Sequence, residues 1–254
     1  MRRTYLLTGA GIVSFILFLI ISIPANTIAS QVKLFEPWNV QMAGVDGTAW
    51  NGRIRSLSFN GFQLFDTHWE LNPAALLLGR LSAIISARSA VGEISFAGTV
   101  SVFGSIAIHD LKVAGPVAPI AGLLNLPVTA GRYQFHGSAL NIINAWPTSF
   151  VGTGQVTDVP LNFMDDSSGP TGSYMIVFNT ESVPADGRLV GTLSDQDGPV
   201  EVDGNIELTP PMNYALKIKL KAQPGAPTEI TRALSFAGPP GPDGRHEISF
   251  AGSL

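Results

Sequence analysis

The side chains that could do chemistry in this sequence are few, and their spacing builds no reactive centre. The four histidines are His68, His109, His136 and His246, and no two of them stand at the spacing of a metal-binding motif. We therefore expect His68 and His109 to lie on the solvent-facing sides of strands. The chain has no cysteine, so thiol catalysis, thiolate metal sites and disulfides are excluded.

Two acidic segments have the composition of calcium ligands. They are Asp165-Asp166 and residues 195–198 (DQDG), but neither leads to the spaced ligands and distal Glu of an EF-hand loop. We interpret both as turns. The sequence has no G-x-S-x-G motif and no phosphate-binding loop, and no carboxylate pair stands out as a sugar-cleaving pair. We therefore expect no enzymatic activity, no metal site and no cofactor.

The N-terminal residues are typical of a membrane anchor. Arg2 and Arg3 precede an uncharged run from Tyr5 to Ile23. As a helix this run would span about 28 Å, close to the hydrocarbon thickness of a bilayer. A secretory signal has a shorter apolar region, but Ala25–Ser30 has the small residues of a cleavage site, so removal of the anchor stays open.

This anchor sets the expected domain organisation. The positive-inside rule predicts a cytoplasmic N-terminus at residues 1–4, a transmembrane helix at 5–23 and a periplasmic β-rich domain at 24–254, with a weak boundary near 167–172. Two of the 15 Lys and Arg residues precede residue 24 and all 19 acidic residues follow it, which leaves 13 basic and 19 acidic side chains, a net charge of −6. A negative domain without clustered cations argues against a nucleic-acid partner.

The exported part has the two-residue periodicity of β-strands. From Ile94 to Ile108 the apolar side chains occupy the even positions, and Phe103-Gly104 is the expected turn. After His109-Asp110 the phase shifts, so that Leu111 and Val113 become the apolar residues. A shift of phase inside a strand predicts a β-bulge at this point.

A hairpin near the C-terminus is the clearest element of the sequence. Residues 200–208 (VEVDGNIEL) and 214–221 (YALKIKLK) both alternate apolar and polar side chains around a five-residue loop. Buried Val, Leu or Ile side chains contribute about 1.5–3 kcal/mol each, and opposite charges across strands only about 0.2–1 kcal/mol. The expected register joins three pairs: Leu208 with Tyr214, Asp203 with Lys219, and Glu201 with Lys221.

Similar glycine-led segments recur along the chain at irregular spacing, starting at Gly92, Gly131, Gly187 and Gly244. Irregular spacing excludes a strict solenoid and favours successive hairpins added to one sheet. The last segment ends at Leu254 and predicts a paired C-terminal strand. The predicted fold class is therefore mostly β: an extended, curved antiparallel sheet with a few short helices, preceded by one transmembrane helix.

Three short helices are expected between the strands. Asn72 can cap the first helix, Pro73 suits its first turn and Gly79 can end it. The second covers about 118–127. In the third, Thr228 is a candidate cap before residues 229–236.

An aromatic-rich stretch precedes the first of these helices. Its aromatic residues alternate with polar residues, so we expect them to line one side of two strands as core. The helix Pro73–Leu78 would then fold back over that side. The aromatic residues are Trp50, Phe59, Phe62, Phe65 and Trp69.

The segments GTAWNGRI (47–54) and HWELNPAALLLGRLSA (68–83) resemble the type II secretion system protein N family. The closing segment PDGRHEISFAGSL (242–254) is similar to the C-terminal strand of that family. Proteins of the AsmA and TamB type share a similar opening pattern. The residues that match the family motif are Gly47, Thr48, Trp50, Gly52, Trp69, Pro73, Leu76, Leu77, Gly79, Arg80 and Leu81.

The resemblance implies an accessory inner-membrane component of the Gram-negative machine that exports folded proteins across the outer membrane. Its partners would be other type II secretion components, and no catalytic residues carry over. Arg80 would be either a helix cap or a partner contact. The AsmA-type similarity gives the alternative, a lipid-binding or lipid-transfer β-groove, which the low content of charged residues, 13%, also favours.

Overall fold

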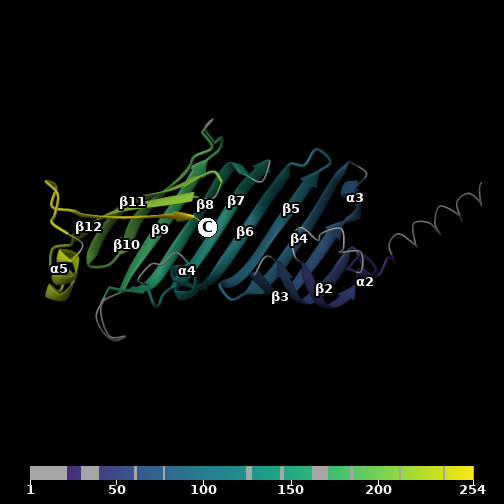
Figure 1. The fold of residues 1–254 in the computed structure, drawn as a ribbon, viewed down its shortest axis with the longest axis horizontal. Coiled ribbons are helices and arrows are strands. Elements are labelled where there is room, and N and C mark those ends of the chain that lie inside the picture. Colours follow the sequence, from purple (N-terminus) through teal and green to yellow (C-terminus); the bar gives the residue numbers. More distant parts are fainter. Residues whose placement is uncertain are drawn as a thin grey trace, which may run out of the picture. The chain divides into compact units, whose positions relative to one another are not determined.

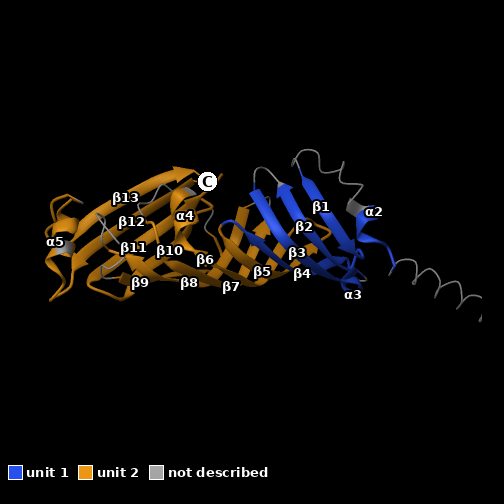
Figure 2. Cartoon of the chain, turned by 90° about the horizontal axis from the view of Figure 1, so that it is seen from below, with its two compact units in different colours: residues 1–90 blue, residues 91–254 orange. Residues whose placement is uncertain are grey.

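The computed structural model describes residues 22–29, 40–59, 62–76, 78–123, 128–143, 146–161, 171–183, 186–211, 213–236 and 238–253. Contacts divide the chain into two compact units, residues 1–90 (unit 1) and 91–254 (unit 2), which Figure 2 shows in different colours. The predicted transmembrane run lies almost wholly outside the described residues. Among the helices that the structure does describe, none is long and apolar enough to cross a membrane.

Unit 1 is a four-stranded antiparallel sheet in which each strand pairs with the next along the chain. The N-terminal helix α2 contacts β1. Figure 1 shows the elements in sequence colours. Their bounds are α2 Ala25–Ala29, β1 Gln41–Gly47, β2 Asn51–Phe59, β3 Phe62–Asn72, α3 Pro73–Leu76 and β4 Arg80–Ser89.

Unit 2 continues the same construction with nine strands, again antiparallel and in chain order. The order ends at β13 and does not return to β5 among the described residues, so the sheet is not closed. The elements are β5 Gly92–Ser101, β6 Ile106–Pro116, α4 Val117–Leu123, β7 Arg132–Ile143, β8 Trp146–Pro160, β9 Thr171–Thr180, β10 Leu189–Asp197, β11 Val200–Thr209, β12 Asn213–Ala222, α5 Thr228–Ser235 and β13 His246–Ser253.

The predicted register of the β11–β12 hairpin is confirmed. Leu208 lies opposite Tyr214, Asp203 opposite Lys219, and Glu201 opposite Lys221. The C-terminal strand β13 pairs with β12, as the final glycine-led segment predicted. The acidic side chains of β11 also form ion pairs that the predicted hairpin register did not include. Arg245 contacts both Glu201 and Asp203.

The predicted bulge at the change of phase is confirmed at Asp110, which has a φ of 53° where the β5–β6 register shifts. Asp66 in β3 and Asp158 in β8 have φ values of 48° and 57° at two further register shifts. Asp tolerates the left-handed region better than most residues because its short side chain can hydrogen-bond locally. Each bulge resets the alternation, so a strand can keep apolar side chains on one face along its whole length.

The short helices differ from the sequence predictions in their boundaries. The Asn72 cap is confirmed, since its Oδ1 accepts a hydrogen bond from the Ala74 N–H at 3.0 Å. The Thr228 cap is wrong: Thr228 is already the first residue of α5, and Pro227 is the cap position without a side-chain hydrogen bond. Pro227 has a φ of −54° and an extended ψ, which suits the residue before a helix.

Candidate functional site

The family-motif residues of unit 1 meet at the turn between β1 and β2. Gly47 and Gly52 lie opposite each other at the end of the two strands, and Gly47 has a φ of 96° that favours glycine. Within the turn, the Thr48 N–H donates to the Asn51 carbonyl at 2.8 Å, and the Asn51 N–H donates to the Thr48 hydroxyl at 3.2 Å. The Gly-Thr pair therefore forms a hydrogen-bonded turn.

Trp69 of β3 fixes this turn from the neighbouring strand. A methyl group on Gly52 would lie 2.3 Å from Trp69 Cζ2, so only glycine lets the indole lie flat against β2. The Trp69 indole N–H donates to the Ala49 carbonyl in the turn at 3.0 Å. The Leu71 N–H donates to the Trp50 carbonyl at 2.6 Å. These contacts explain why the motif combines glycine and tryptophan at this spacing.

The expectation of a single aromatic core in this region is wrong. Trp50 lies in the turn and not in a strand, Phe62 is 62% exposed and Phe65 is 42% exposed. The helix α3 is short and has no buried residue, so it does not seal a core. The side chains of Phe59 and Leu77 lie outside the described residues. Alternation in the sequence did not reveal that the described residues give this sheet little cover.

The corner between α3 and β4 carries the rest of the motif. Pro73 begins α3, and Gly79, with a φ of 66°, accepts the left-handed conformation after the helix. Arg80 is the exposed first residue of β4 and forms no ion pair with the residues that the structure describes. The large apolar side chains at this corner are exposed rather than packed: Leu76, Leu78, Leu81 and Ile84.

A charged cluster lies on β2, β3 and β4. Arg53 hydrogen-bonds and ion-pairs with the Asp66 carboxylate, and Arg88 Nη1 lies 3.6 Å from Asp66 Oδ2. The hydrogen bond from Arg53 is the main cause that lowers the pKa of Asp66 below its ordinary value. The cluster places a charged bridge across the β3 bulge and therefore has a structural role.

The other candidate chemical residues do not converge. His68, His109 and His136 are exposed on separate strands, while His246 Nδ1 lies 2.7 Å from the Gly238 carbonyl. Among the described residues no group of three or more His, Cys, Asp or Glu side chains could hold a metal ion.

The interpretation of both acidic segments as turns needs one correction. Asp195 and Asp197 belong to strand β10, and Asp195 accepts the Val202 N–H at 3.0 Å. Only Gly198 and Pro199 form the turn. The segment Asp165-Asp166 lies outside the described residues.

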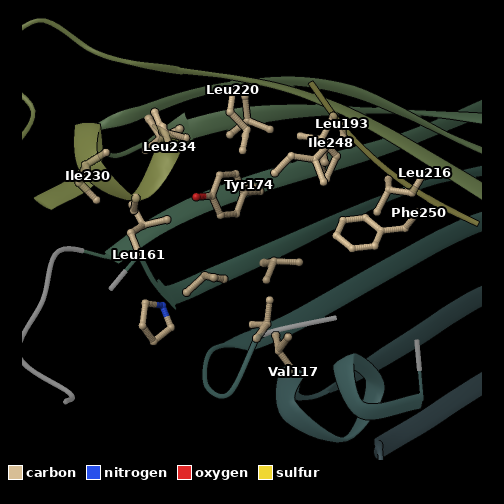
Figure 3. Close-up of a pocket in the computed structure, with 18 residues that line it drawn as sticks. Val117, Leu161, Tyr174, Leu193, Leu216, Leu220, Ile230, Leu234, Ile248 and Phe250 are labelled. Carbon is tan, nitrogen blue, oxygen red and sulfur yellow. The ribbon is translucent and has the colours of Figure 1, made fainter. Parts of the chain in front are cut away.

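Unit 2 contains an apolar pocket of about 300 Å³ that sequence reasoning did not locate. Its walls come from β8 to β13 and from both helices of the unit, and Figure 3 shows the labelled side chains converging on one space. The described residues in its lining are aliphatic apart from Phe250 and Tyr174, and Tyr174 has the only polar side chain among them. Strand alternation predicted an apolar face, but nothing local in the sequence marked where that face closes around a cavity.

The sheet must curl to make this pocket. Strands β8 and β13 are five strand spacings apart, about 24 Å across a flat sheet. Yet Val156 of β8 and Phe250 of β13 line the same cavity. On β8 and β9 of the same unit, the rings of Phe150 and Phe178 pack 4.7 Å apart, and Phe178 lies against Gly191, where a methyl group would be 2.7 Å from the ring. Aromatic rings over strand glycines let a sheet bend without leaving voids.

Comparison with known proteins identifies the family. The model of the family described as "Type II secretion system (T2SS), protein N" matches residues 38–249. The chain belongs to the type II secretion system protein N family. The type II secretion system protein N of Aeromonas hydrophila is 27% identical over 266 aligned positions, which cover the whole of both chains.

A second relative matches over a shorter length. The type II secretion system protein N of Vibrio cholerae serotype O1 is 31% identical over 111 residues, 43% of each chain. No solved structure matches the chain. Membership of the protein N family confirms the resemblance drawn from the segments 47–54 and 68–83. The contact of Trp69 in β3 with the β1–β2 turn gives those segments a structural reason.

Proposed function

We propose that this protein is an accessory inner-membrane component of the type II secretion system, which aids export of folded proteins through protein–protein contacts and has no enzymatic role. Family membership supports a place in the secretion system. The predicted anchor at residues 5–23 is the basis for the inner-membrane location and for a periplasmic domain. The observation that supports the proposed protein–protein contacts is the exposed corner between α3 and β4.

This corner has the properties of a binding surface. Leu78 is 77% exposed, and Leu76 and Leu81 are exposed beside it. Arg80 adds a cation that forms no ion pair among the described residues. Interfaces are commonly built from apolar side chains with arginine near them, and clustered exposed apolar side chains mark such sites. A partner segment with an apolar face and an acidic residue fits this corner.

Deletion of the gene tests the role in secretion. We expect exported enzymes to accumulate in the periplasm and to decrease in the medium. Unchanged secretion in a strain with an otherwise intact machine would contradict the proposed role.

Point variants in the deletion strain then test the surface. Leu78→Asp should fail to restore secretion although the protein still folds, because an exposed substitution changes stability by only about 0.5 kcal/mol. Phe103→Asp is the matched control: Phe103 is 93% exposed at the β5–β6 turn and lies outside the family motif. If Leu78→Asp restores secretion as well as Phe103→Asp does, the corner is not the contact surface.

A second candidate function is binding or transfer of lipid, as the AsmA-type similarity suggests. The specific observation in its favour is the apolar pocket of unit 2, which has no charged residue among its described lining residues. Analysis of lipid in the full chain purified in mild detergent tests it. Lipid-free protein would contradict this second function and leave the role in secretion unaffected.

A further inference from the structure

The pocket of unit 2 lies next to a buried aliphatic cluster, and that cluster supplies part of its wall. Ile230 and Leu234 of α5 are 2% and 5% exposed, and they pack with Val200 and Val202 of β11 and with Leu161. All five also line the pocket. The outer face of α5 is polar at Thr231 and Arg232, which are exposed. The helix is therefore an amphipathic cover over the cavity.

The connections on either side of α5 give this cover room to move. Gly225 and Gly238 flank the helix with φ values of 87° and 107°, and no heavy atom would approach within 4 Å of a side chain at either position. Uncrowded glycines in left-handed conformations can change their backbone angles at low cost. A shift of α5 would widen the route of a ligand into the pocket, which is already partly open, without distortion of the strands.

The described lining of the pocket is uncharged. Among these residues, Tyr174 carries the one polar side chain. Burial, followed by the nearby charge of Asp195, raises the pKa of Tyr174 to about 12, so its hydroxyl is neutral at physiological pH. A carboxylate or phosphate inside the pocket would find no cation among the described lining residues. This favours a ligand whose charged part stays outside.

A peptide segment is a poor occupant of such a space. Its backbone amide groups would enter a cavity whose lining offers one hydroxyl, and each unpaired amide would cost several kcal/mol. A hydrocarbon chain carries no such groups. The volume also sets its length, because an apolar cavity of about 150 Å³ holds the six carbons of benzene, so about 300 Å³ holds roughly a dozen carbons.

We propose that this pocket binds one unbranched acyl chain beneath α5, with the carboxylate or headgroup of the fatty acid or phospholipid outside the cavity. The proposal deepens the lipid-binding alternative and rests on it, while the role in secretion does not depend on it.

The test feeds cells a photoactivatable long-chain fatty acid, irradiates them, purifies the full chain and maps the adducts by mass spectrometry. We expect adducts on the peptides that contain Tyr174, Leu193 and Leu234. The adduct mass separates the two sources of the chain, because a phospholipid leaves its headgroup on the protein and a free fatty acid does not. Adducts spread over exposed apolar residues such as Phe103 would contradict the proposal that the pocket binds the chain.

Two pairs of variants make the test specific. Leu193→Trp fills the cavity from β10 and should abolish the adducts, whereas Thr192→Trp, on the opposite face of the same strand, should keep them. Ala233→Phe fills the cavity from α5 and repeats the test should Leu193→Trp fail to fold, and Thr231→Phe is its exposed control. Equal adduct yields within both pairs contradict the proposal.

A series of saturated fatty acids that compete with the photoprobe measures the depth of the site. Each added CH₂ should improve competition about fourfold while the pocket fills, from about 0.8 kcal/mol per buried CH₂. The gain should stop at roughly twelve carbons, since the cavity is then full. A gain that continues with length, as partition into detergent would give, overturns the proposal.

The outcome also separates the site from the broader function. Lipid that co-purifies with the chain while adducts map elsewhere would reject this pocket and keep lipid binding. Absence of both lipid and adducts would reject lipid binding together with the pocket.

Discussion

Units 1 and 2 use the same antiparallel hairpins but differ in what they bury. Among the described residues of unit 1, the buried side chains are small: Ala25, Ala49, Ala87 and Thr67. Unit 2 buries large apolar side chains, among them Leu189, Phe178 and Ile230. Unit 2 thus has its own hydrophobic core, whereas unit 1 leaves most of its large apolar side chains at least partly exposed.

The difference shows that antiparallel sheets of the same topology can be stabilised by different interactions. In unit 1 the shape depends on backbone hydrogen bonds and on close packing of Trp69 against Gly52. In unit 2 it depends on removing aliphatic surface from water, which is the main force that stabilises most folded domains. A sheet of the first kind has apolar surface to offer a protein partner, and a sheet of the second kind can enclose a ligand.

The largest expected effect comes from truncation of a core residue in unit 2. Leu189 is fully buried at 0% exposure, so Leu189→Ala should lower the free energy of unfolding by about 2–5 kcal/mol. Val190→Ala, one residue further along β10 and 38% exposed, is the control and should cost much less. Chemical denaturation followed by tryptophan fluorescence measures both, and equal losses would refute the assignment of the core to this face.

A smaller effect is expected from an added methyl group in unit 1. Gly52→Ala would place its Cβ 2.3 Å from Trp69 and 2.7 Å from the Asp46 carbonyl, and should destabilise the protein by about 1–3 kcal/mol. Gly122→Ala in α4 meets no atom within 4 Å and should stabilise by about 0.5–1 kcal/mol. The opposite signs can be read from thermal unfolding, and a neutral Gly52→Ala would show that the Trp69 contact is loose.

A matched pair of tryptophans compares the units directly. The Trp69 indole N–H donates to the Ala49 carbonyl at 3.0 Å in unit 1, and the Trp146 N–H donates to the Gly187 carbonyl at 2.7 Å in unit 2. Substitution of either by Phe removes one hydrogen bond, which contributes about 0.5–1.5 kcal/mol. Denaturant titration should give similar losses for the two variants. A much larger loss for Trp69→Phe would show that unit 1 depends more strongly on this contact.

The last effect is absent at neutral pH and should appear only at high pH, in unit 2. The pKa of Tyr174 is about 12 in the folded protein and 10 in the unfolded chain, so the unfolded state loses its proton first. Stability from this group is present below pH 10 and is lost as pH rises toward 12. Tyr174→Phe should therefore flatten the fall of stability in this window, as measured by denaturation at several pH values. An unchanged slope would show that the hydroxyl is solvated.

Much of the fold could be predicted from local patterns. Alternation and charge pairing were sufficient for the β11–β12 register, and the change of phase at Asp110 located a bulge. The motif at Trp69 identified the family, but the sequence did not show what the motif residues contact. The contact between Gly52 and the indole joins two different strands, and local patterns do not reveal such a contact. The predicted boundary near 167–172 falls largely outside the described residues and stays a prediction.

The pocket could not be predicted for a different reason. It requires β8 and β13 to approach each other, and such curvature is the sum of many small twists and bends in strands that each look ordinary. Val156 and Phe250 are far apart in sequence and have no complementary charge or motif to connect them. A periodic pattern shows which face of a strand is apolar. It does not show how strongly the sheet curves, and therefore not which distant strands bring their apolar faces together.

Pairing between successive strands has a consequence for how this protein reaches its structure. From β6 to β13, each strand of unit 2 pairs with the strand just before it in the chain. Pairing between neighbouring strands keeps each loop that must close short, which limits the entropy cost of closing it. Such a sheet can add one hairpin at a time, with β13 last, and no distant segment has to arrive before the earlier strands become ordered.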